Sequence, residues 1–160
     1  MKGIIHTRID DRLIHGQVAL LWSSGLGINR IIVINDEVAN NEVQKAILRM
    51  AAQGKINTSI LNKQTACENI LSGKYADQKC MIILKNPKDA LELLNMGLDI
   101  KCINVGNMIS KDENAIQVKK SLKLSQEDIE YFKELSSRGV ELTSQMVPDD
   151  KITHLFDFIK

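Results

Sequence analysis

Short runs of β-branched and aliphatic residues alternate along the chain with segments in which apolar residues recur at helical spacing. Runs of the first kind predict strands, and segments of the second kind predict amphipathic helices. The predicted strands cover residues 4–9, 30–35, 58–61, 79–84, 101–105 and 140–147. The run over 79–84 is almost continuously apolar, which is typical of a strand buried on both faces of a parallel sheet.

The helical segments are recognised by their apolar faces and by the residues that begin or end them. A capping box at Ser125 begins one helix, which ends near Gly139, and Pro87 suits the first turn of another. The apolar faces are Ile14, Val18, Leu21 and Trp22 before Gly25 and Gly27; Val43, Ile47, Met50 and Ala51 before Gly54; residues 65–71; Leu91 and Leu94; Ile129, Phe132 and Leu135; and, after Pro148, Ile152, Leu155, Phe156 and Ile159. The stretch 106–114 contains turn-forming residues without a clear period, so its conformation is not predicted.

This alternation predicts an α/β fold: a single-domain, doubly wound, mainly parallel sheet with helices on both faces. A length of 160 residues suits one domain, and only 2 Pro and 9 Gly are spread over it without a linker or repeat. We therefore expect one domain over residues 1–160. In such sheets function gathers in the loops that leave the carboxyl ends of the strands.

Composition narrows the choice of function. The net charge of +1 argues against a general binder of nucleic acid or anionic membranes. Cys67, Cys80 and Cys102 are odd in number and widely spaced, so we expect packing roles rather than disulfides or a zinc site. The chain has no run of about 18 apolar residues and no secretory leader pattern, so a cytoplasmic protein is expected. His6 and His154 lack partners at metal-ligand spacing, and we expect them to be structural.

The first strand-to-helix loop is dense in charged and polar side chains. It reads Arg-Ile-Asp-Asp-Arg-Leu-Ile-His-Gly-Gln-Val over residues 8–18. A strand-to-helix turn presents free backbone N–H groups and the positive end of the helix dipole to an anion, and Arg12 adds further donors. A neutral histidine can attack phosphorus through one ring nitrogen while a carboxylate orients the other, so His15 is a candidate nucleophile and Asp10 or Asp11 a candidate orienting group. The alternative is that Asp10 or Asp11 merely caps the helix while His15 lies on the surface.

This loop resembles the hallmark of the IIB components of the mannose-family bacterial sugar phosphotransferase system. Their pattern R-[IV]-D-[DE]-R-[LV]-[IV]-H-G-Q-V is matched at every position of residues 8–18. Further segments resemble the family in order, namely residues 35–39, Asn86-Pro87 with Asp89, residues 103–108 and residues 139–141. The pair Asn107-Met108 is more similar to the N-acetylgalactosamine branch than to the mannose branch.

The resemblance implies a phosphocarrier domain in which His15 is transiently phosphorylated on Nδ1. A phosphohistidine on the IIA protein would be the donor, and a sugar presented by the IIC/IID membrane complex would be the acceptor. Arg12 would neutralise phosphoryl oxygens, and Asp10 would hold the loop or the imidazole. Backbone amides around Leu13, Ile14 and Gly16 would bind the phosphoryl group, with Arg8 and Asp11 as further loop residues. No metal and no cofactor are required.

The resemblance also implies a cytoplasmic protein that associates transiently with the inner face of the membrane without being inserted. Two other functions compete with this interpretation. One is a flavodoxin-like module that binds a phosphorylated ligand without covalent chemistry, and the other is a phosphohydrolase that uses Asp10 or Asp11 as its nucleophile. The sequence leaves open the sugar, the oligomeric state and which aspartate orients His15.

Overall fold

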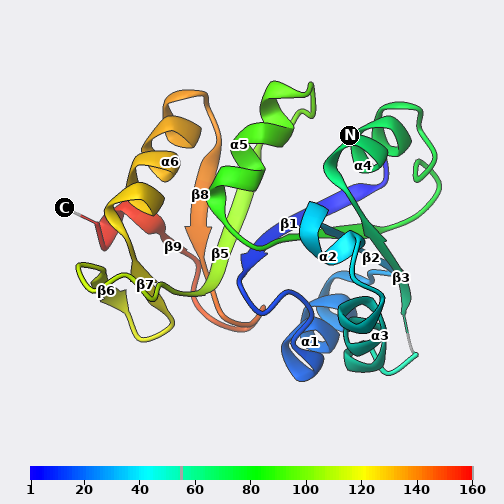
Figure 1. The fold of residues 1–160 in the computed structure, drawn as a ribbon, viewed down its shortest axis with the longest axis horizontal. Coiled ribbons are helices and arrows are strands. Elements are labelled where there is room, and N and C mark those ends of the chain that lie inside the picture. The colour runs from blue at the N-terminus through cyan, green and yellow to red at the C-terminus, as the bar shows by residue number, and fades with distance from the viewer. Residues whose placement is uncertain (55, 160) are drawn as a thin grey trace.

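The protein folds around one mainly parallel β-sheet, as a computed structural model that describes residues 1–54 and 56–159 shows (Figure 1). Seven strands lie in the order β3-β2-β4-β1-β5-β7-β6, and β8 pairs with β5 and with β9. Among the strand pairs of the described residues, only β6–β7 and β8–β9 are antiparallel. The strands are β1 (Ile4–Asp10), β2 (Arg30–Ile34), β3 (Asn57–Leu61), β4 (Cys80–Leu84), β5 (Cys102–Ile109), β6 (Ile116–Lys119), β7 (Leu122–Leu124), β8 (Glu141–Ser144) and β9 (Thr153–His154).

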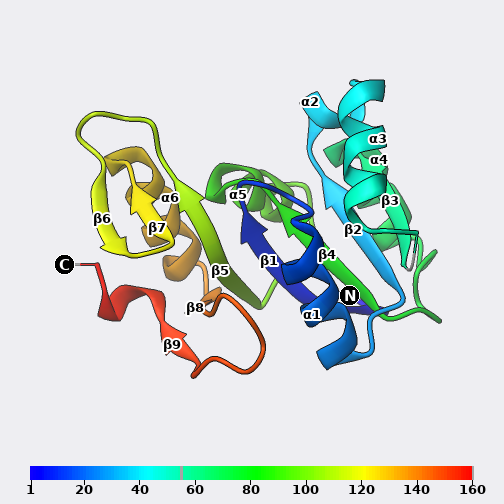
Figure 2. The same ribbon diagram turned by 90° about the horizontal axis from the view of Figure 1, so that it is seen from below.

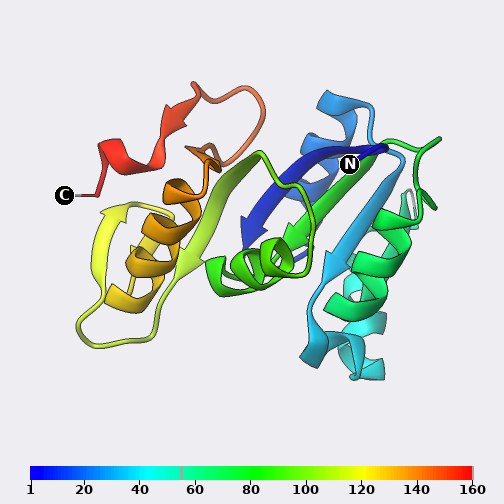
Figure 3. The same ribbon diagram turned by 90° about the horizontal axis from the view of Figure 1, so that it is seen from above.

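The helices cover both faces of this sheet, so the expected α/β class is confirmed. Figures 2 and 3 view the molecule from opposite sides, with α1 before the sheet in one and α5 and α6 before it in the other. Connections that run in opposite directions along a parallel sheet place their helices on opposite faces, because the crossovers are right-handed. The helices are α1 (Gly16–Leu26), α2 (Asp36–Ala39), α3 (Glu42–Ala51), α4 (Lys63–Leu71), α5 (Pro87–Asn95), α6 (Gln126–Ser137) and the 3₁₀ turn η1 (Leu155–Asp157).

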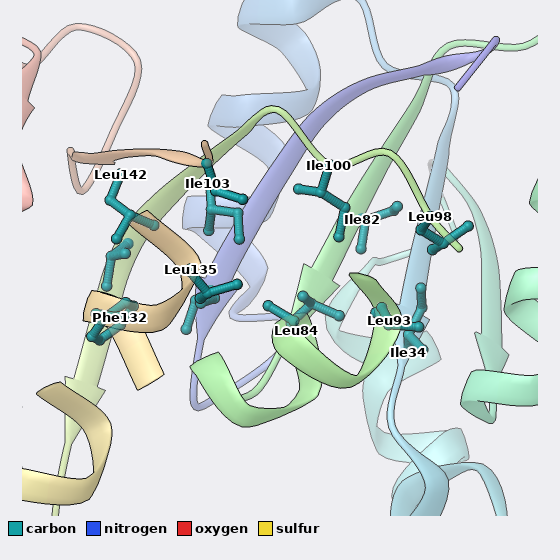
Figure 4. Close-up of a cluster of buried hydrophobic side chains, with 14 of the residues drawn as sticks. Ile34, Ile82, Leu84, Leu93, Leu98, Ile100, Ile103, Phe132, Leu135 and Leu142 are labelled. Carbon is teal, nitrogen blue, oxygen red and sulfur yellow. The ribbon is translucent and has the colours of Figure 1, made fainter. Parts of the chain in front are cut away.

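Alternate residues of the central strands supply two separate hydrophobic cores. On β2, Ile32 and Ile34 face the α4, α5 and α6 side, whereas Ile31 and Val33 face the α1 and α3 side. Figure 4 shows the first of these cores, with Leu93 of α5 lying against the sheet. Strand β4 is buried at every position, as its continuous apolar run predicts.

The prediction of a C-terminal amphipathic helix after Pro148 is wrong. The segment instead forms the short strand β9 and the 3₁₀ turn η1. Leu155 and Ile159 are buried as expected, but Ile152 is 62% exposed. Thr153 and His154 pair with β8, so backbone N–H and C=O groups at an otherwise open sheet edge gain hydrogen-bond partners. This tertiary contact outweighs the local helical period.

Residues 106–124 extend the sheet in a way that the sequence pattern does not reveal. Strand β5 continues to Ile109, beyond its predicted end at residue 105, and the hairpin of β6 and β7 follows. The predicted last strand, over 140–147, is shorter in the structure and spans Glu141–Ser144. The four-residue helix α2 was also not predicted.

Helix α3 is confirmed, but its apolar stripe faces outward. Val43, Ile47 and Met50 are 70%, 58% and 76% exposed. Leu48 and Ala52 make the contact with the core instead. The period of a helix predicts that one face is apolar, but it does not show whether the protein's own core covers that face.

Helices in the described part of the chain are short, the longest having 12 residues. None of them has both the length and the apolar character needed to cross a membrane.

Candidate functional site

The loop after β1 lies at the carboxyl edge of the sheet, where adjacent connections separate. Strand β1 lies between β4 and β5. The chain leaves β1 for α1 on one face, and it leaves β4 for α5 on the other (Figures 2 and 3). Such a divergence opens a crevice at the strand ends, which is the usual ligand position in doubly wound sheets.

His15 occupies the N-cap position of α1 and is exposed to solvent. Its side chain makes no capping hydrogen bond, and the first turn of α1 contains no acidic residue. The helices α2 to α6 differ, because each is capped by an Asn or Ser side chain: Asn35, Asn41, Asn62, Asn86 and Ser125. The first-turn amides of α1 therefore lack the side-chain acceptor that the other helices have, and they are suited to an external anion.

Asp10 forms ion pairs with two arginines, Arg8 and Arg12, near this end of α1. Its carboxylate accepts hydrogen bonds from Nε and Nη2 of Arg12, both at 2.9 Å, and from the Arg12 backbone N–H at 3.1 Å. Nη2 of Arg8 also donates to it, at 3.3 Å. The hydrogen bonds to Asp10 raise the pKa of Arg12. This Arg-Asp-Arg triad carries one net positive charge, and only Arg12 reaches solvent, with 33% of its side chain exposed.

Arg8 is buried and holds the loop after β8 against β1. Its Nη1 donates to the backbone O of Gln145 at 2.9 Å, and its side chain is only 2% exposed. Burial lowers the pKa of this guanidinium, and the charge of Asp10 opposes that effect. As one of the predicted loop residues, Arg8 lies below the surface, and protein atoms engage its guanidinium.

Gly106 leaves the space that the Arg8 guanidinium occupies. The β1–β5 register advances by two residues on β5 and by one on β1 here, since Ile9 pairs with Val105 and Asp10 with Asn107. A Cβ atom at Gly106 would overlap the Cζ and both Nη atoms of Arg8. The glycine therefore accommodates a buried cation at a bulge.

The Gly106→Ala variant is expected to be less stable by about 1–3 kcal/mol, because the added methyl group forces Arg8 away from Asp10 and Gln145. Urea unfolding followed by circular dichroism measures this change. A loss below about 0.5 kcal/mol would show that Arg8 can move aside at little cost.

Asp11 fastens the loop to β5. One carboxylate oxygen accepts from Nδ2 of Asn107 and the other from the backbone N–H of Ile109, both at 2.8 Å. The backbone N–H of Asp11 donates to the Asn107 carbonyl at 2.9 Å. The segment around Asn107 thus has a structural role that links it to the first motif.

The two apolar residues of the loop anchor it from below. Leu13 and Ile14 are 6% and 4% exposed and belong to the α1 and α3 core. Leu13 has a φ of 62°, in the left-handed region that a branched residue seldom adopts, and its N–H donates to the Asp10 carbonyl at 2.9 Å. The Leu13 amide is therefore engaged within the loop in this structure, whereas its use in phosphoryl binding stays a prediction.

The structure brings the motif residues together, and both aspartates hold the loop rather than the His15 imidazole. Among the described residues, neither Asp10 nor Asp11 is hydrogen-bonded to the His15 imidazole, because both are engaged by arginines or by β5. Neither caps α1. The supporting residues Gln145 and Met146 were not predicted, because they lie more than 130 positions from Arg8 and Arg12 and carry no local signal.

Trp22 connects α1 with the same supporting loop. Its Nε1 donates to the Met146 carbonyl at 2.8 Å, and the Arg8 guanidinium lies 5.4 Å from its ring centroid. The ring of His6 stacks on the indole, with centroids 4.5 Å apart and planes inclined by 16°. Burial, together with the charge of Arg8, lowers the pKa of His6 to about 4.

Stability is therefore expected to fall as the pH drops from about 6.5 to about 4. The folded state keeps His6 neutral down to about pH 4, whereas the unfolded chain takes up the proton near the ordinary histidine pKa of 6.5. This contribution is complete above pH 6.5 and is lost below it, because the unfolded state binds more protons in that window. Urea midpoints of the wild type and of His6→Phe, which keeps a ring on Trp22, should diverge across this range. Parallel pH profiles would contradict the effect.

Two cavities are lined by residues of the loop. One of about 190 Å³ lies between Arg12 and Leu13 on one side and Ile47 of α3 on the other. The second, of about 290 Å³, is lined by Asp11, Asn86 and Met108 among others. A larger cavity of about 620 Å³ surrounds Lys63 and contains none of the motif residues.

Comparisons with known proteins show a family to which this chain is similar. Residues 4–160 match the family described as PTS system sorbose subfamily IIB component. The chain is 36% identical over 160 residues to the N-acetylgalactosamine-specific phosphotransferase enzyme IIB component 2 of Escherichia coli, covering 99% of this chain and 100% of that one. The crystal structure of the IIBSor domain of the sorbose permease from Klebsiella pneumoniae superposes with a TM-score of 0.90 at 34% identity, covering 99% of this chain and 96% of that one.

The chain is also similar to part of a longer protein. It is 36% identical over 152 residues to the mannose-specific EIIAB component of Escherichia coli, covering 95% of this chain and 47% of that relative. It therefore spans about half the length of this relative. Relatives named for four different sugars match at 32–36% identity, so identity does not single out a branch.

Proposed function

The chain belongs to the family of sorbose-subfamily IIB components of the sugar phosphotransferase system, and from this membership we propose that His15 is its phosphoryl carrier. The observation that carries the proposal is the exposed imidazole at the N-terminus of α1, a helix end without a side-chain cap. A phosphoryl group on this imidazole lies within reach of first-turn amides and of the positive end of the helix dipole.

The proposed reaction has two transfers. The lone pair of His15 Nδ1 attacks the phosphorus of a phosphohistidine on the IIA protein, so that one N–P bond forms as the donor's N–P bond breaks. A hydroxyl oxygen of the sugar, presented by the IIC/IID membrane components, then attacks this phosphorus and releases His15. The hydroxyl proton leaves to a base or to solvent. The activity is that of a protein-N(pi)-phosphohistidine–sugar phosphotransferase.

Arg12 is proposed to compensate the charge of the transferred group. Its guanidinium is partly exposed, and its bidentate bond to Asp10 holds it in one orientation. Phosphoryl transfer depends mainly on positioning and charge compensation, which this arrangement supplies without a metal or cofactor. Gly16 permits a close backbone approach at the helix start. Asp10, Arg8 and Asp11 act as positioning residues.

A phosphohydrolase based on an aspartate is disfavoured by the geometry. A nucleophilic carboxylate needs a free oxygen that faces the substrate. Both oxygens of Asp10 are bonded to arginines, and both oxygens of Asp11 are bonded to β5. A module that only binds a phosphorylated ligand could use the same loop. It differs from a carrier in that His15 would never become covalently phosphorylated.

The partners follow from the same proposal. We assign a IIA phosphodonor, and IIC and IID membrane components with their sugar, to this chain as one IIB domain over residues 1–160. It would work in the cytoplasm and associate transiently with the inner face of the membrane.

Reconstitution tests the proposal directly. The protein is incubated with radiolabelled phosphoenolpyruvate, enzyme I, HPr and the cognate IIA protein. We expect a covalent label that is lost in acid and persists in alkali, as a phosphohistidine does. Absence of label would indicate a binding module, and a label that alkali releases would indicate an aspartyl phosphate.

A further inference from the structure

Helix α3 presents a row of apolar side chains that the fold itself does not cover. Val43, Ile47 and Met50 are spaced by four and three residues and are therefore neighbours on one helix face. All three are more than half exposed, at 58–76%. An apolar row of this kind on a short helix is typical of a protein interaction surface. We call these three residues the α3 stripe.

The α3 stripe borders the loop that holds His15. Ile47 lines the cavity of about 190 Å³ together with Arg12 and Leu13. The C-terminal end of α3 reaches the start of α1, because a Cβ atom at Gly16 would lie 3.2 Å from the Ala51 carbonyl oxygen. A protein that covers Arg12 in the loop before His15 therefore also meets Ile47 of the α3 stripe at this cavity.

Charges beside the stripe favour a partner that carries an anion. Arg12 and Lys85 line the same cavity as Ile47, and Arg49 is exposed on α3 itself. The Asp11 carboxylate in this cavity already accepts two hydrogen bonds from β5. The three cations Arg8, Arg12 and Lys85 exceed the carboxylates of Asp10 and Asp11 by one positive charge. This excess attracts a partner that brings a phosphoryl group more than one that removes it.

We propose that the α3 stripe is the docking surface for the protein that donates the phosphoryl group to His15. An apolar patch of the donor covers Val43, Ile47 and Met50 while its phosphohistidine lies between Arg12 and the start of α1. The small area suits a carrier that must release one partner before it meets the next. This inference rests on the proposed function of His15.

The test uses Ile47→Asp and Val43→Asp, with Leu71→Asp as the matched control. Leu71 is 60% exposed on α4, which packs on the opposite face of the sheet. Initial rates of labelling are measured against the concentration of phosphorylated IIA. The half-saturating concentration should rise roughly tenfold in both stripe variants and stay unchanged in the control, with similar maximal rates in all.

A binding experiment separates this inference from the proposed function. Isotope-labelled His15→Ala protein is titrated with unphosphorylated IIA, and amide resonances of α3 should shift even though no transfer can occur. If the wild type takes no label, the proposed function fails, whereas shifts confined to α3 and its neighbours would still support docking.

Several outcomes would overturn the docking proposal. One is equal behaviour of Ile47→Asp and Leu71→Asp with phosphorylated IIA. The proposal would also fail if the stripe variants accepted the phosphoryl group from IIA normally but transferred it more slowly to the sugar. That result would assign the stripe to the membrane components. Dimers that form with rising concentration in the wild type and are absent in the stripe variants would assign the stripe to a second copy of the chain. Binding to anionic lipid vesicles that the stripe variants abolish would assign it to the membrane.

Discussion

The His15→Ala variant is expected to take up no phosphoryl group from phosphorylated IIA. The imidazole is the proposed nucleophile, and Asp10 and Asp11, the nearest alternatives in the motif, have both carboxylate oxygens engaged. The same variant should unfold at nearly the wild-type urea concentration, because an exposed side chain at an uncapped helix end contributes little to the core. Labelling and urea unfolding are measured on the same preparation.

His154→Ala provides the matched control for this experiment. Its side chain is 62% exposed, and His154 lies on β9, paired with β8 rather than in the loop after β1. It should therefore be labelled at the wild-type rate. Label retained in His15→Ala, or lost in His154→Ala alone, would assign the phosphoryl group to another residue.

The Asp10→Asn variant should have the largest effect on stability, a loss of about 3–5 kcal/mol. Asp10 and Arg8 are 1% and 2% exposed, so removing the negative charge leaves the buried guanidinium without compensation. The bidentate bond from Arg12 also loses one of its two acceptors, because an amide nitrogen cannot accept from a guanidinium. Urea unfolding measures the loss.

Arg12→Ala distinguishes the structural role of the triad from its catalytic role. The buried Arg8–Asp10 pair remains in this variant, and Arg12 is one-third exposed, so stability should change by no more than about 1 kcal/mol. Transfer should nevertheless slow by roughly 10²-fold, since the positioned charge is gone. Normal transfer by folded Arg12→Ala would remove Arg12 from the mechanism, and wild-type stability of Asp10→Asn would show that Arg8 does not depend on this carboxylate.

Local patterns predicted most of the sheet and its helices. The β-branched run of β2 and the uninterrupted apolar run of β4 have few alternatives to a buried strand, and the capping box at Ser125 marks the start of α6 within one residue. Such signals lie within a few neighbouring positions, so no tertiary information is needed to recognise them.

The incorrect elements depend on contacts between distant segments. The segment 152–159 has a helical period, yet it pairs as β9 with the free edge of β8. The hairpin of β6 and β7 exists because β7 joins the end of β5 at Met108 and Ile109. In both places the backbone gains hydrogen bonds from a strand edge whose position no local pattern discloses.

The sequence by itself determined the sheet class, the position of the site after β1 and the candidate nucleophile His15, because these follow from short-range periodicity and from one contiguous motif. Only the tertiary structure decided what each charged side chain does. Asp10 serves the arginines rather than the imidazole, Arg8 is buried against Gln145, and Gly106 makes room for it. These roles arise from burial and pairing among segments up to 137 positions apart, and the energetics of a buried charge depend on the groups around it rather than on its neighbours in the chain.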